Sequence, residues 1–269
     1  MSEFFLELFT EEVPAKLQIT ARNSLSDSFT KLLSEKNISF KKKSIYSVPN
    51  RLVICFEGLD KEILEKKEEK KGPNIDAPKQ ALEGFLRSNN IKIHDVFKKK
   101  IEKGEFYFFI KPEKKIKTLD ILQNSIPTIL DKIDWKKSMR WADYSLSWGR
   151  PLKLILAIFD GKVLNFNYHH LISSNITIID KEFEDKTKKI SSFKNYRDII
   201  KKNNIILDHD LRKNFIKKEI DKISKKKNIF TDINQNLLEE VTNLVEQPNI
   251  LICKFDKKFL NIPKEILIV

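Results

Sequence analysis

Short apolar runs alternate along the chain with longer stretches that have apolar residues at helical spacing. Residues 152–159 are almost wholly apolar, and a short run with two apolar faces is typical of a buried strand. The Asp160-Gly161 pair that follows favours the positive φ angles of a two-residue hairpin loop. We therefore expect this strand to pair with residues 163–168, where apolar and more polar residues alternate.

The same patterns predict the remaining elements. Alternating or two-faced apolar runs predict strands at 4–9, 45–56 (with a break at 48–51), 105–110, 205–207 and 250–253. Helical spacing predicts one helix that begins after Thr10 and others over 78–88, 118–131, 195–202, 211–227 and 235–246. The charged run 61–71 fits an exposed helix or an edge strand, whereas 173–189 is polar without a clear period, which favours a loop.

Three carboxylates lie close together in the sequence before the first helix. Thr10 is placed to cap this helix, and Glu11 and Glu12 suit its first turn, where the helix dipole favours negative charge. With Glu7, the same two glutamates also raise the alternative of a metal-dependent hydrolase. The helix dipole explains them more simply and is the favoured interpretation.

The helix expected at 211–227 is the clearest amphipathic one in the chain. Eight basic and two acidic residues surround its apolar stripe. A basic helix face can cover a phosphate backbone, but in a lysine-rich chain it is more simply a solvated surface. The expected stripe consists of Leu211, Phe215, Ile216, Ile220 and Ile223.

All three tryptophans, Trp135, Trp141 and Trp148, lie in one short segment with Arg140 and Arg150. Large aromatic rings beside guanidinium groups can form packed cation–π pairs, or they can stack on nucleic-acid bases. Plain packing in the core is the favoured interpretation of the rings.

The net charge of +13 favours an anionic partner, with nucleic acid the first candidate. Lysine is abundant and arginine scarce, as in proteins from AT-rich genomes, so charge alone does not decide the function. No apolar run approaches the roughly 20 residues of a membrane span, and acidic residues stand where a signal peptide would be basic. Cys55 and Cys253, each in an apolar segment, indicate buried, reduced thiols and a cytoplasmic protein.

Several catalytic chemistries lack their motifs in this sequence. The six glycines are isolated, so there is neither a phosphate-binding loop nor a dinucleotide fingerprint. The four histidines lack a metal-binding spacing, and neither cysteine has an activating neighbour. We therefore expect binding and assembly rather than catalysis, with no metal or cofactor held by this chain.

The C-terminal run 264–269 begins after Pro263 and ends in four consecutive apolar residues without a stop signal. This pattern favours the amino-terminal part of a longer protein.

An ordered series of short motifs extends over nearly the whole chain, from Glu-Glu-Val-Pro at 11–14 to Leu-Asn-Ile-Pro-Lys-Glu-Ile-Leu-Ile at 260–268. With this series the chain resembles the beta subunit of bacterial glycine–tRNA ligase. The spacing from Lys-Ser-Met-Arg-Trp at 137–141 to Arg150-Pro151 matches that family without a gap. The other motifs are Val48-Pro49-Asn50-Arg51-Leu52, Lys71-Gly72-Pro73, Gly104-Glu105 and the run 237–246.

The chain departs from the family pattern at three places. Asn50 and Ala142 replace an Arg and a Gly that are usual in the family. At 177–183 the sequence Thr-Ile-Ile-Asp-Lys-Glu-Phe replaces the family's Thr-Arg-Gly-His-Arg-Phe segment.

The resemblance implies a role in the ATP-dependent attachment of glycine to its tRNA. In that family the alpha subunit carries the adenylate chemistry, so ATP and Mg²⁺ are expected on the alpha partner of an alpha2beta2 assembly. The amino-terminal part of the family is also similar to the B3/B4-type modules of phenylalanine–tRNA ligase beta chains. The expected fold is therefore α+β, with mixed, largely antiparallel sheets packed with helices, in two regions at 1–170 and 171–269.

The expected function is to bind glycine tRNA and to assemble with a catalytic partner, with no catalytic residues in this chain. The alternative is a stand-alone basic RNA-binding module without a partner enzyme. The candidate tRNA contacts are first Lys136, Lys137, Arg140 and Arg150, and second Lys217, Lys218, Lys225 and Lys226.

Overall fold

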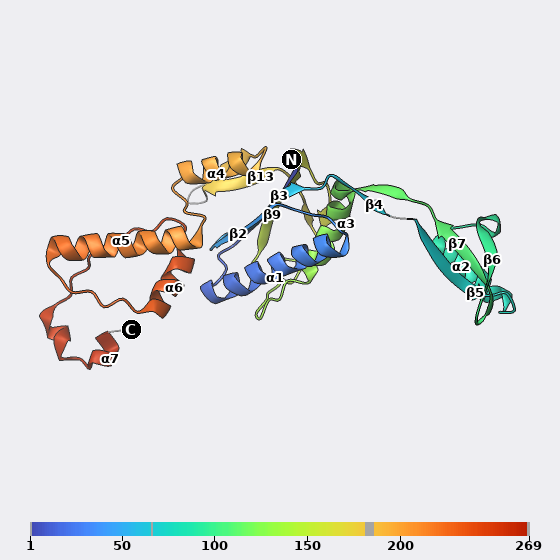
Figure 1. Cartoon of the computed structure of the whole chain (residues 1–269). Helices are drawn as coiled ribbons and strands as arrows, with labels where there is room; N and C mark the ends of the chain where they lie inside the picture. Colours follow the sequence, from blue (N-terminus) through green and yellow to red (C-terminus); the bar gives the residue numbers. More distant parts are fainter. Residues whose placement is uncertain (1, 66, 181–185, 268–269) are drawn as a thin grey trace.

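The centre of the molecule is a five-stranded antiparallel sheet with the strand order β10-β9-β1-β3-β2 (Figure 1). This computed structural model describes residues 2–65, 67–180 and 186–267. Strands β1 and β3 lie inside the sheet and have neighbours on both sides, as their two-faced apolar sequences predict. The strands are β1 (Ser2–Thr10), β2 (Lys42–Val48), β3 (Arg51–Leu59), β9 (Leu152–Phe159) and β10 (Lys162–Val163).

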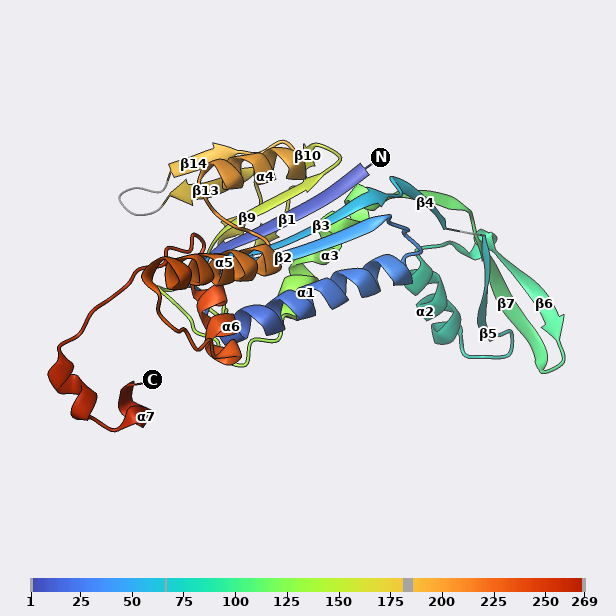
Figure 2. The same cartoon turned by 60° about the vertical axis from the view of Figure 1, so that its left-hand side comes forward.

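Helices cover both faces of this sheet (Figure 2). Side chains along a strand point alternately to the two faces. Phe4 and the residues in step with it therefore pack under α1 (Ala15–Glu35) and α3 (Thr118–Asp131). Phe5 and its counterparts pack on the opposite side, under α4 (Phe193–Lys202). Two apolar cores thus hold the central sheet from either side.

The two hairpins of the sheet lie where the sequence predicts them. Val48 pairs with Arg51 across the turn between β2 and β3. Asp160 and Gly161 have φ angles of 49° and 76° and join β9 to β10, as expected for this dipeptide. The strand after the turn is shorter than predicted. It ends at Val163, and β11 (Asn167–Tyr168) instead pairs with β12 (Leu171–Ile172).

A small appendage is inserted between β3 and α3 and projects from one end of the molecule (Figure 1). A two-stranded ribbon of β4 (Glu62–Glu65) and β8 (Lys114–Lys117) connects it to the centre. The described parts of the charged run 61–71 therefore contain strands and no helix. The appendage consists of β5 (Glu68–Asn74), α2 (Lys79–Asn89), the 3-10 turn η1 (Ile93–Asp95), β6 (Val96–Ile101) and β7 (Gly104–Lys111).

The C-terminal elements project from the other end of the molecule (Figure 1). Helix α5 lies beyond the β2 edge of the sheet and contacts β2 and α6, and α6 also contacts α1. These elements are α5 (His209–Lys227), α6 (Gln235–Leu244), the 3-10 turn η2 (Lys257–Asn261) and α7 (Lys264–Leu267).

Several predicted boundaries were wrong. The first helix begins at Ala15, so Thr10 belongs to β1 and does not cap it, and Glu11 and Glu12 precede it. The range 173–189, predicted as a loop, contains the hairpin of β13 (Ile176–Asp180) and β14 (Lys186–Lys189). The predicted strands at 205–207 and 250–253 are irregular. Part of the replaced family segment, residues 181–183, lies outside the described residues.

The apolar stripe predicted for α5 was partly wrong. So was that of the helix predicted at 235–246, whose expected inward residues are Leu237, Leu238, Val241, Leu244 and Val245. Leu211 is 64% exposed and Leu237 54% exposed, whereas Arg212 and Asn243 are buried. These apolar side chains lie on helix faces that no other element in the described ranges covers. Cys253 is exposed, contrary to prediction, and only Cys55 is buried. Burial raises the pKa of the Cys55 thiol far above its ordinary value, so this thiol stays protonated.

No helix in the described ranges has both the length and the apolar character needed to cross a lipid bilayer.

Candidate nucleic-acid interface

The segment between α3 and β9 is folded around a pair of tryptophans. Trp148 is buried, and its ring lies 5.1 Å from that of Trp135 and 6.0 Å from that of Tyr168. Backbone hydrogen bonds between Met139 and Trp148 close the segment into a loop. A Cβ atom at Gly149 would lie 2.2 Å from the Trp135 ring, so the chain can pass this ring only as glycine. Core packing of the tryptophans is therefore confirmed.

This fixed loop presents basic side chains to solvent. Lys136, Lys137 and Arg140 are exposed, and Arg150 is half-buried. The Arg150 guanidinium donates a hydrogen bond of 2.9 Å to its neighbour's carbonyl. In the described part of the chain no carboxylate forms an ion pair with any of the four. Their charge therefore remains available to an anion.

An exposed aromatic group lies on the same loop. Tyr144 is 43% exposed and stacks on His170, with ring centroids 3.6 Å apart and planes only 7° apart. Burial, and to a lesser extent the charge of His169, lowers the pKa of His170. A neutral imidazole under the Tyr144 ring leaves the anion-attracting charge of the loop to its lysine and arginine side chains.

The second predicted set lies on α5. Lys218, Lys225 and Lys226 are exposed, and Lys217 is half-buried. The helix dipole accounts for part of this pattern, because lysines near a helix C-terminus are favoured by the partial negative charge there. Lys225 and Lys226 lie in the last turn of α5.

The structure does not bring the two sets into one patch. The lysine-rich end of α5 points away from the central sheet. The loop between α3 and β9 (residues 132–151, called here the tryptophan loop) instead lies beside α1 and α3 (Figure 1). Each set is a surface of its own, and a ligand that contacts both has to reach across the molecule.

The carboxylates near the N-terminus do not form a catalytic group. Glu7 is buried, and its Oε1 accepts hydrogen bonds from Arg51 Nη1 (2.8 Å) and from the Tyr196 hydroxyl (2.6 Å). Glu11 forms an ion pair with Lys153 at 2.6 Å. Nowhere in the described ranges do three or more His, Cys, Asp or Glu side chains gather in a metal-binding arrangement. The hydrolase alternative therefore has no site in the described part of the chain.

Two buried arginines were missed by the sequence analysis. Burial alone would lower the pKa of Arg51, but the charges of Glu7, Tyr196 and Glu246 and the hydrogen bond to Glu7 together outweigh it, and the pKa is raised above the usual value. Arg51 also donates to Thr177 Oγ1 (3.0 Å) and to the Ile178 carbonyl (2.6 Å), which ties β3 to β13. One feature of the sequence could have revealed it. Arginine is rare in this chain, and Arg51 stands directly before the apolar run 52–56.

Arg212 connects the C-terminal helices to the sheet in the same way. Its guanidinium donates to the carbonyls of Thr242 (2.6 Å), Ile206 (2.6 Å) and Ser47 (3.2 Å). Burial lowers its pKa to about 10, so the side chain is still charged at neutral pH. Both arginines serve the fold and are not exposed to an external anion.

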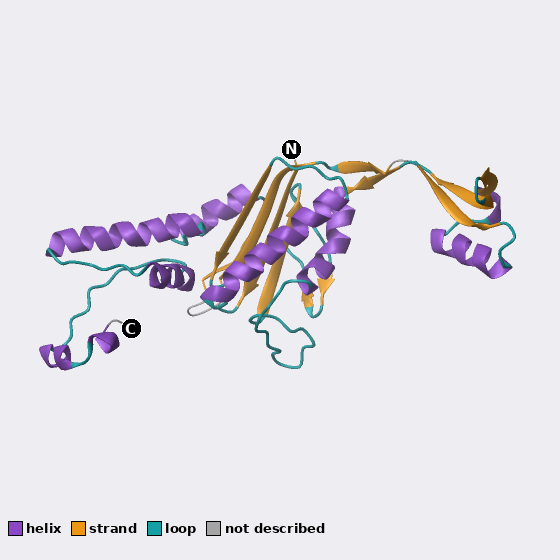
Figure 3. Cartoon of the chain, turned by 60° about the horizontal axis from the view of Figure 1, so that its bottom comes forward, coloured by secondary structure: helices purple, strands orange, loops and turns teal. Residues whose placement is uncertain are grey.

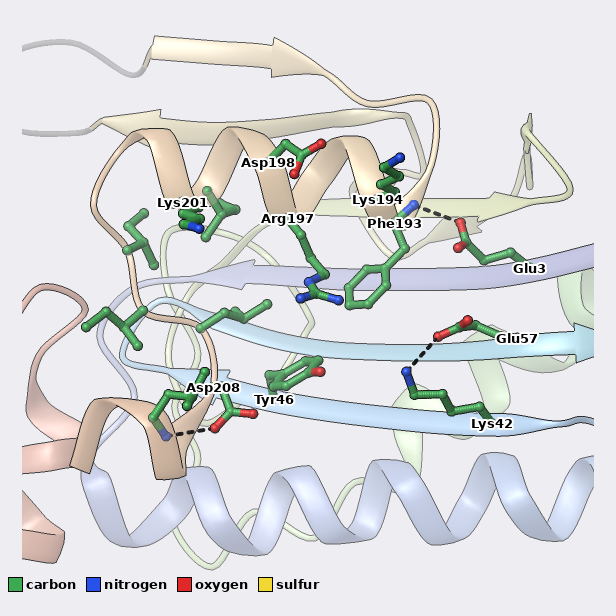
Figure 4. Close-up of a pocket in the computed structure, with 15 residues that line it drawn as sticks. Glu3, Lys42, Tyr46, Glu57, Phe193, Lys194, Arg197, Asp198, Lys201 and Asp208 are labelled. Carbon is green, nitrogen blue, oxygen red and sulfur yellow. Dashed lines mark hydrogen bonds and ion pairs between the residues drawn. The ribbon is translucent and has the colours of Figure 1, made fainter. Parts of the chain in front are cut away.

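A groove of ≈ 690 Å³ lies between α4, β2 and the start of α5 (Figure 4). Tyr46 and Phe193 stack along its wall, with Arg197 beside the Phe193 ring. Four basic side chains line it together with the four acidic ones Glu3, Glu57, Asp198 and Asp208. Because these charges balance, the groove lacks the positive potential that a polyanion needs.

The fold and this surface define a class of protein first. It is an α+β protein with antiparallel sheets and many exposed basic side chains, some of them on the loop between α3 and β9 and on helix α5. A profile of the family described as "Glycyl-tRNA synthetase beta subunit" matches residues 4–269, and the chain belongs to this family.

Similar proteins agree with this assignment. The glycine–tRNA ligase beta subunits of Rickettsia akari and Rickettsia typhi are 37% and 38% identical to the chain over 268 residues. That of Rickettsia conorii is 37% identical over the same length. All of this chain is covered, but it spans about 40% of the length of these relatives.

Proposed function

We propose that this chain supports the ATP-dependent attachment of glycine to its tRNA, by binding the tRNA and by assembling with a catalytic alpha subunit. Family membership over residues 4–269 supports this function. The relatives are named as beta subunits of glycine–tRNA ligase, and such a name implies an alpha partner. ATP and Mg²⁺ bind the alpha subunit in this proposal, the assembly is alpha2beta2, and the protein acts in the cytoplasm.

The tRNA contact that we propose first is the tryptophan loop. One observation carries this proposal. The loop is fixed by buried Trp148, and its basic side chains have no ion-pair partners in the described ranges. A loop whose backbone is already fixed loses little backbone freedom when it binds a phosphate. The loop contacts are Lys136, Lys137, Arg140 and Arg150, and the second set is Lys217, Lys218, Lys225 and Lys226.

Two finer features of the proposal concern architecture. The division into regions at 1–170 and 171–269 stays a prediction, and so does the likeness to the B3/B4-type modules of phenylalanine–tRNA ligase beta chains. An experimental structure of the assembly with tRNA would test both.

The decisive experiment reverses two charges on the loop. In the protein co-purified with its alpha subunit, Lys136→Glu together with Lys137→Glu is expected to weaken binding of glycine tRNA. The slope of log affinity against log salt should become shallower by about 2, because roughly one counterion is released for each phosphate contact. Fluorescence anisotropy at several salt concentrations measures both quantities.

A matched control reverses two exposed lysines at the end of α1, Lys31 and Lys36. This variant has the same change of net charge, so general electrostatic attraction predicts the same loss, whereas a local contact predicts a smaller one. Equal losses in the two variants would remove the loop from the interface. Failure of any alpha subunit to co-purify would favour the stand-alone RNA-binding module.

A further inference from the structure

The three-stranded sheet of the appendage collects aromatic and basic side chains on one face. Strand β7 lies between β5 and β6. Phe108 of β7 is directly opposite Phe97 on one side and Lys71 on the other, and Phe106 is opposite Lys99. Residues that are directly opposite each other in a sheet share a face, as do residues two apart in one strand. These five side chains therefore form one surface, called here the aromatic face.

Helix α2 packs on the other side of this sheet. Gly72 follows Lys71, so its Cβ direction points away from the aromatic face. A Cβ atom built there would lie 2.9 Å from the ring of Phe85, which belongs to α2. Within the described ranges no other α-helix or sheet covers the aromatic face (Figure 3).

The rings of the aromatic face are arranged so that one of them is accessible. Phe97 stacks on Phe108, with centroids 6.1 Å apart and planes 27° apart. Phe108 is buried as a result, whereas Phe97 is 37% exposed. Lys71 Nζ lies 3.6 Å from the centre of the Phe106 ring. The face thus offers one accessible ring, Phe97, and a lysine ammonium group held over a second ring, Phe106.

The appendage carries a positive net charge, and two of its lysines, Lys71 and Lys99, lie on the aromatic face. The neighbouring lysines of edge strand β6, Lys98 and Lys100, are exposed on the opposite face, because side chains alternate along a strand. Lys99 Nζ lies 5.3 Å from the Phe108 ring and forms an ion pair with Glu69 at 2.6 Å. Residues 68–111 together contain ten basic and seven acidic side chains. The partner of this surface is therefore expected to be anionic.

We propose that the aromatic face binds unpaired nucleotides of the tRNA, with one base stacked on Phe97 and phosphates near Lys71 and Lys99. The inference rests on the proposed function, because it assigns a second RNA contact to the same protein. A base offers its π-face only when it is outside a duplex, and stacking on aromatic rings of an open sheet is a common mode of single-strand recognition. Docking of a protein on the exposed ring is the alternative that the tests below distinguish.

The first test compares two substitutions of the stacking ring. In the complex with the alpha subunit, Phe97→Ala is expected to weaken binding of glycine tRNA roughly 5- to 150-fold, the range for loss of one stacked base. Phe97→Trp keeps a planar ring and is expected to bind within about 3-fold of the unchanged protein. A loss of structure in Phe97→Ala would be visible by circular dichroism, and the tryptophan variant then carries the test through quenching of its fluorescence by bound RNA.

The second test uses a 12-nucleotide oligouridylate as the probe and a duplex of the same length as the comparison. The single strand is expected to bind more tightly, and Lys71→Glu to weaken it more than Lys79→Glu, which changes an exposed lysine on α2. Equal effects of the two lysine changes, or equal affinity for strand and duplex, would overturn the proposal.

The outcomes separate this proposal from the function on which it rests. If the unchanged protein binds glycine tRNA but Phe97→Ala has no effect, the aromatic face is not an RNA site and the proposed function stands. If the complex does not bind glycine tRNA at all, the proposed function fails, and oligouridylate binding alone decides the aromatic face. If Phe97→Ala instead releases the alpha subunit, the face docks a protein and the proposal is wrong.

Discussion

At the scale of single residues, two buried arginines join parts of the chain that are far apart in sequence. Arg51 of β3 donates a hydrogen bond to Glu7 of β1, and the same carboxylate accepts one from Tyr196 of α4. Arg51 also donates to a backbone carbonyl of β13. Its Nε also lies 3.4 Å from the Glu246 carboxylate, beyond α6. The guanidinium group suits this position because its five donors can serve several acceptors at once.

Replacement of Arg51 by methionine tests this role. The change leaves the Glu7 carboxylate buried without its cation, so the free energy of unfolding is expected to fall by roughly 3–5 kcal/mol. Urea unfolding at 25 °C measures the change. Addition of Glu7→Gln to the same chain removes the orphaned charge, and the double variant should be more stable than Arg51→Met alone. A double variant that is less stable than the single one would contradict the account.

At the scale of elements, the central strands and α3 could be predicted closely because short two-faced apolar runs have few other uses in a globular fold. The β13–β14 hairpin was missed because Lys186–Lys189 is exposed and polar, so it has no apolar alternation. The stripes of α5 and α6 misled for another reason. Periodicity identifies the apolar side of a helix but not whether another element covers that side. Arg212 is buried because it donates hydrogen bonds to backbone carbonyls, and these carbonyls cannot be identified from the sequence.

The candidate contacts, like the elements, divide into features that the sequence predicts and features that it does not. Exposure of Lys136, Lys137 and Arg140 follows from the sequence, and their role in tRNA binding stays a prediction. The aromatic face could not be found in the sequence, because Phe97 and Lys71 come together only through the pairing of β5, β6 and β7.

The stabilising contribution of the ion pair between α5 and α6 should depend on pH. Burial would raise the pKa of Glu239, but the hydrogen bonds and the charges of Lys213 and His209 together outweigh it, and the pKa lies below its ordinary value of 4.5. A carboxyl with a lowered pKa in the folded state contributes stability above pH 4.5, and this contribution is lost as the pH falls through the folded value. The loss comes from protonation of the carboxylate that pairs with Lys213 at 2.6 Å.

Thermal unfolding from pH 3 to pH 7 measures this effect. The Tm of the unchanged protein should exceed that of Glu239→Gln at neutral pH, and the gap should close below pH 4.5. Glu240→Gln is the control, since Glu240 is exposed and forms no ion pair in the described part of the chain. A gap of constant size at every pH would show that the ion pair is not its source.

At the scale of the whole molecule, the appendage is attached through a single ribbon. Its chain enters and leaves at one point, where Thr118 bonds to the carbonyls of Lys61 (2.9 Å) and Asp60 (2.6 Å). Ile63 and Ile116 of the ribbon pack against the central core, whereas the sheet beyond them does not contribute to that cluster. The centre is therefore expected to fold without the appendage.

A deletion checks this independence. Glu65 and Lys114 are directly opposite each other in the ribbon, so residues 66–113 can be replaced by Asn-Gly, which forms a two-residue hairpin turn. The shortened protein is expected to unfold within a few degrees of the original Tm and to retain its alpha partner, while its affinity for oligouridylate falls. Loss of the central fold, seen by circular dichroism, would show that the appendage is structurally required.

The appendage and the lysine-rich end of α5 lie at opposite ends of the molecule (Figure 1). Two weak binding sites that are far apart act together only on a ligand long enough to reach both. Once such a ligand is bound at one site, its local concentration at the second site is high. A short RNA fragment reaches one end and gains nothing from the other. With the two contacts that we propose, this separation makes the length of the RNA a criterion for its selection, independent of its sequence.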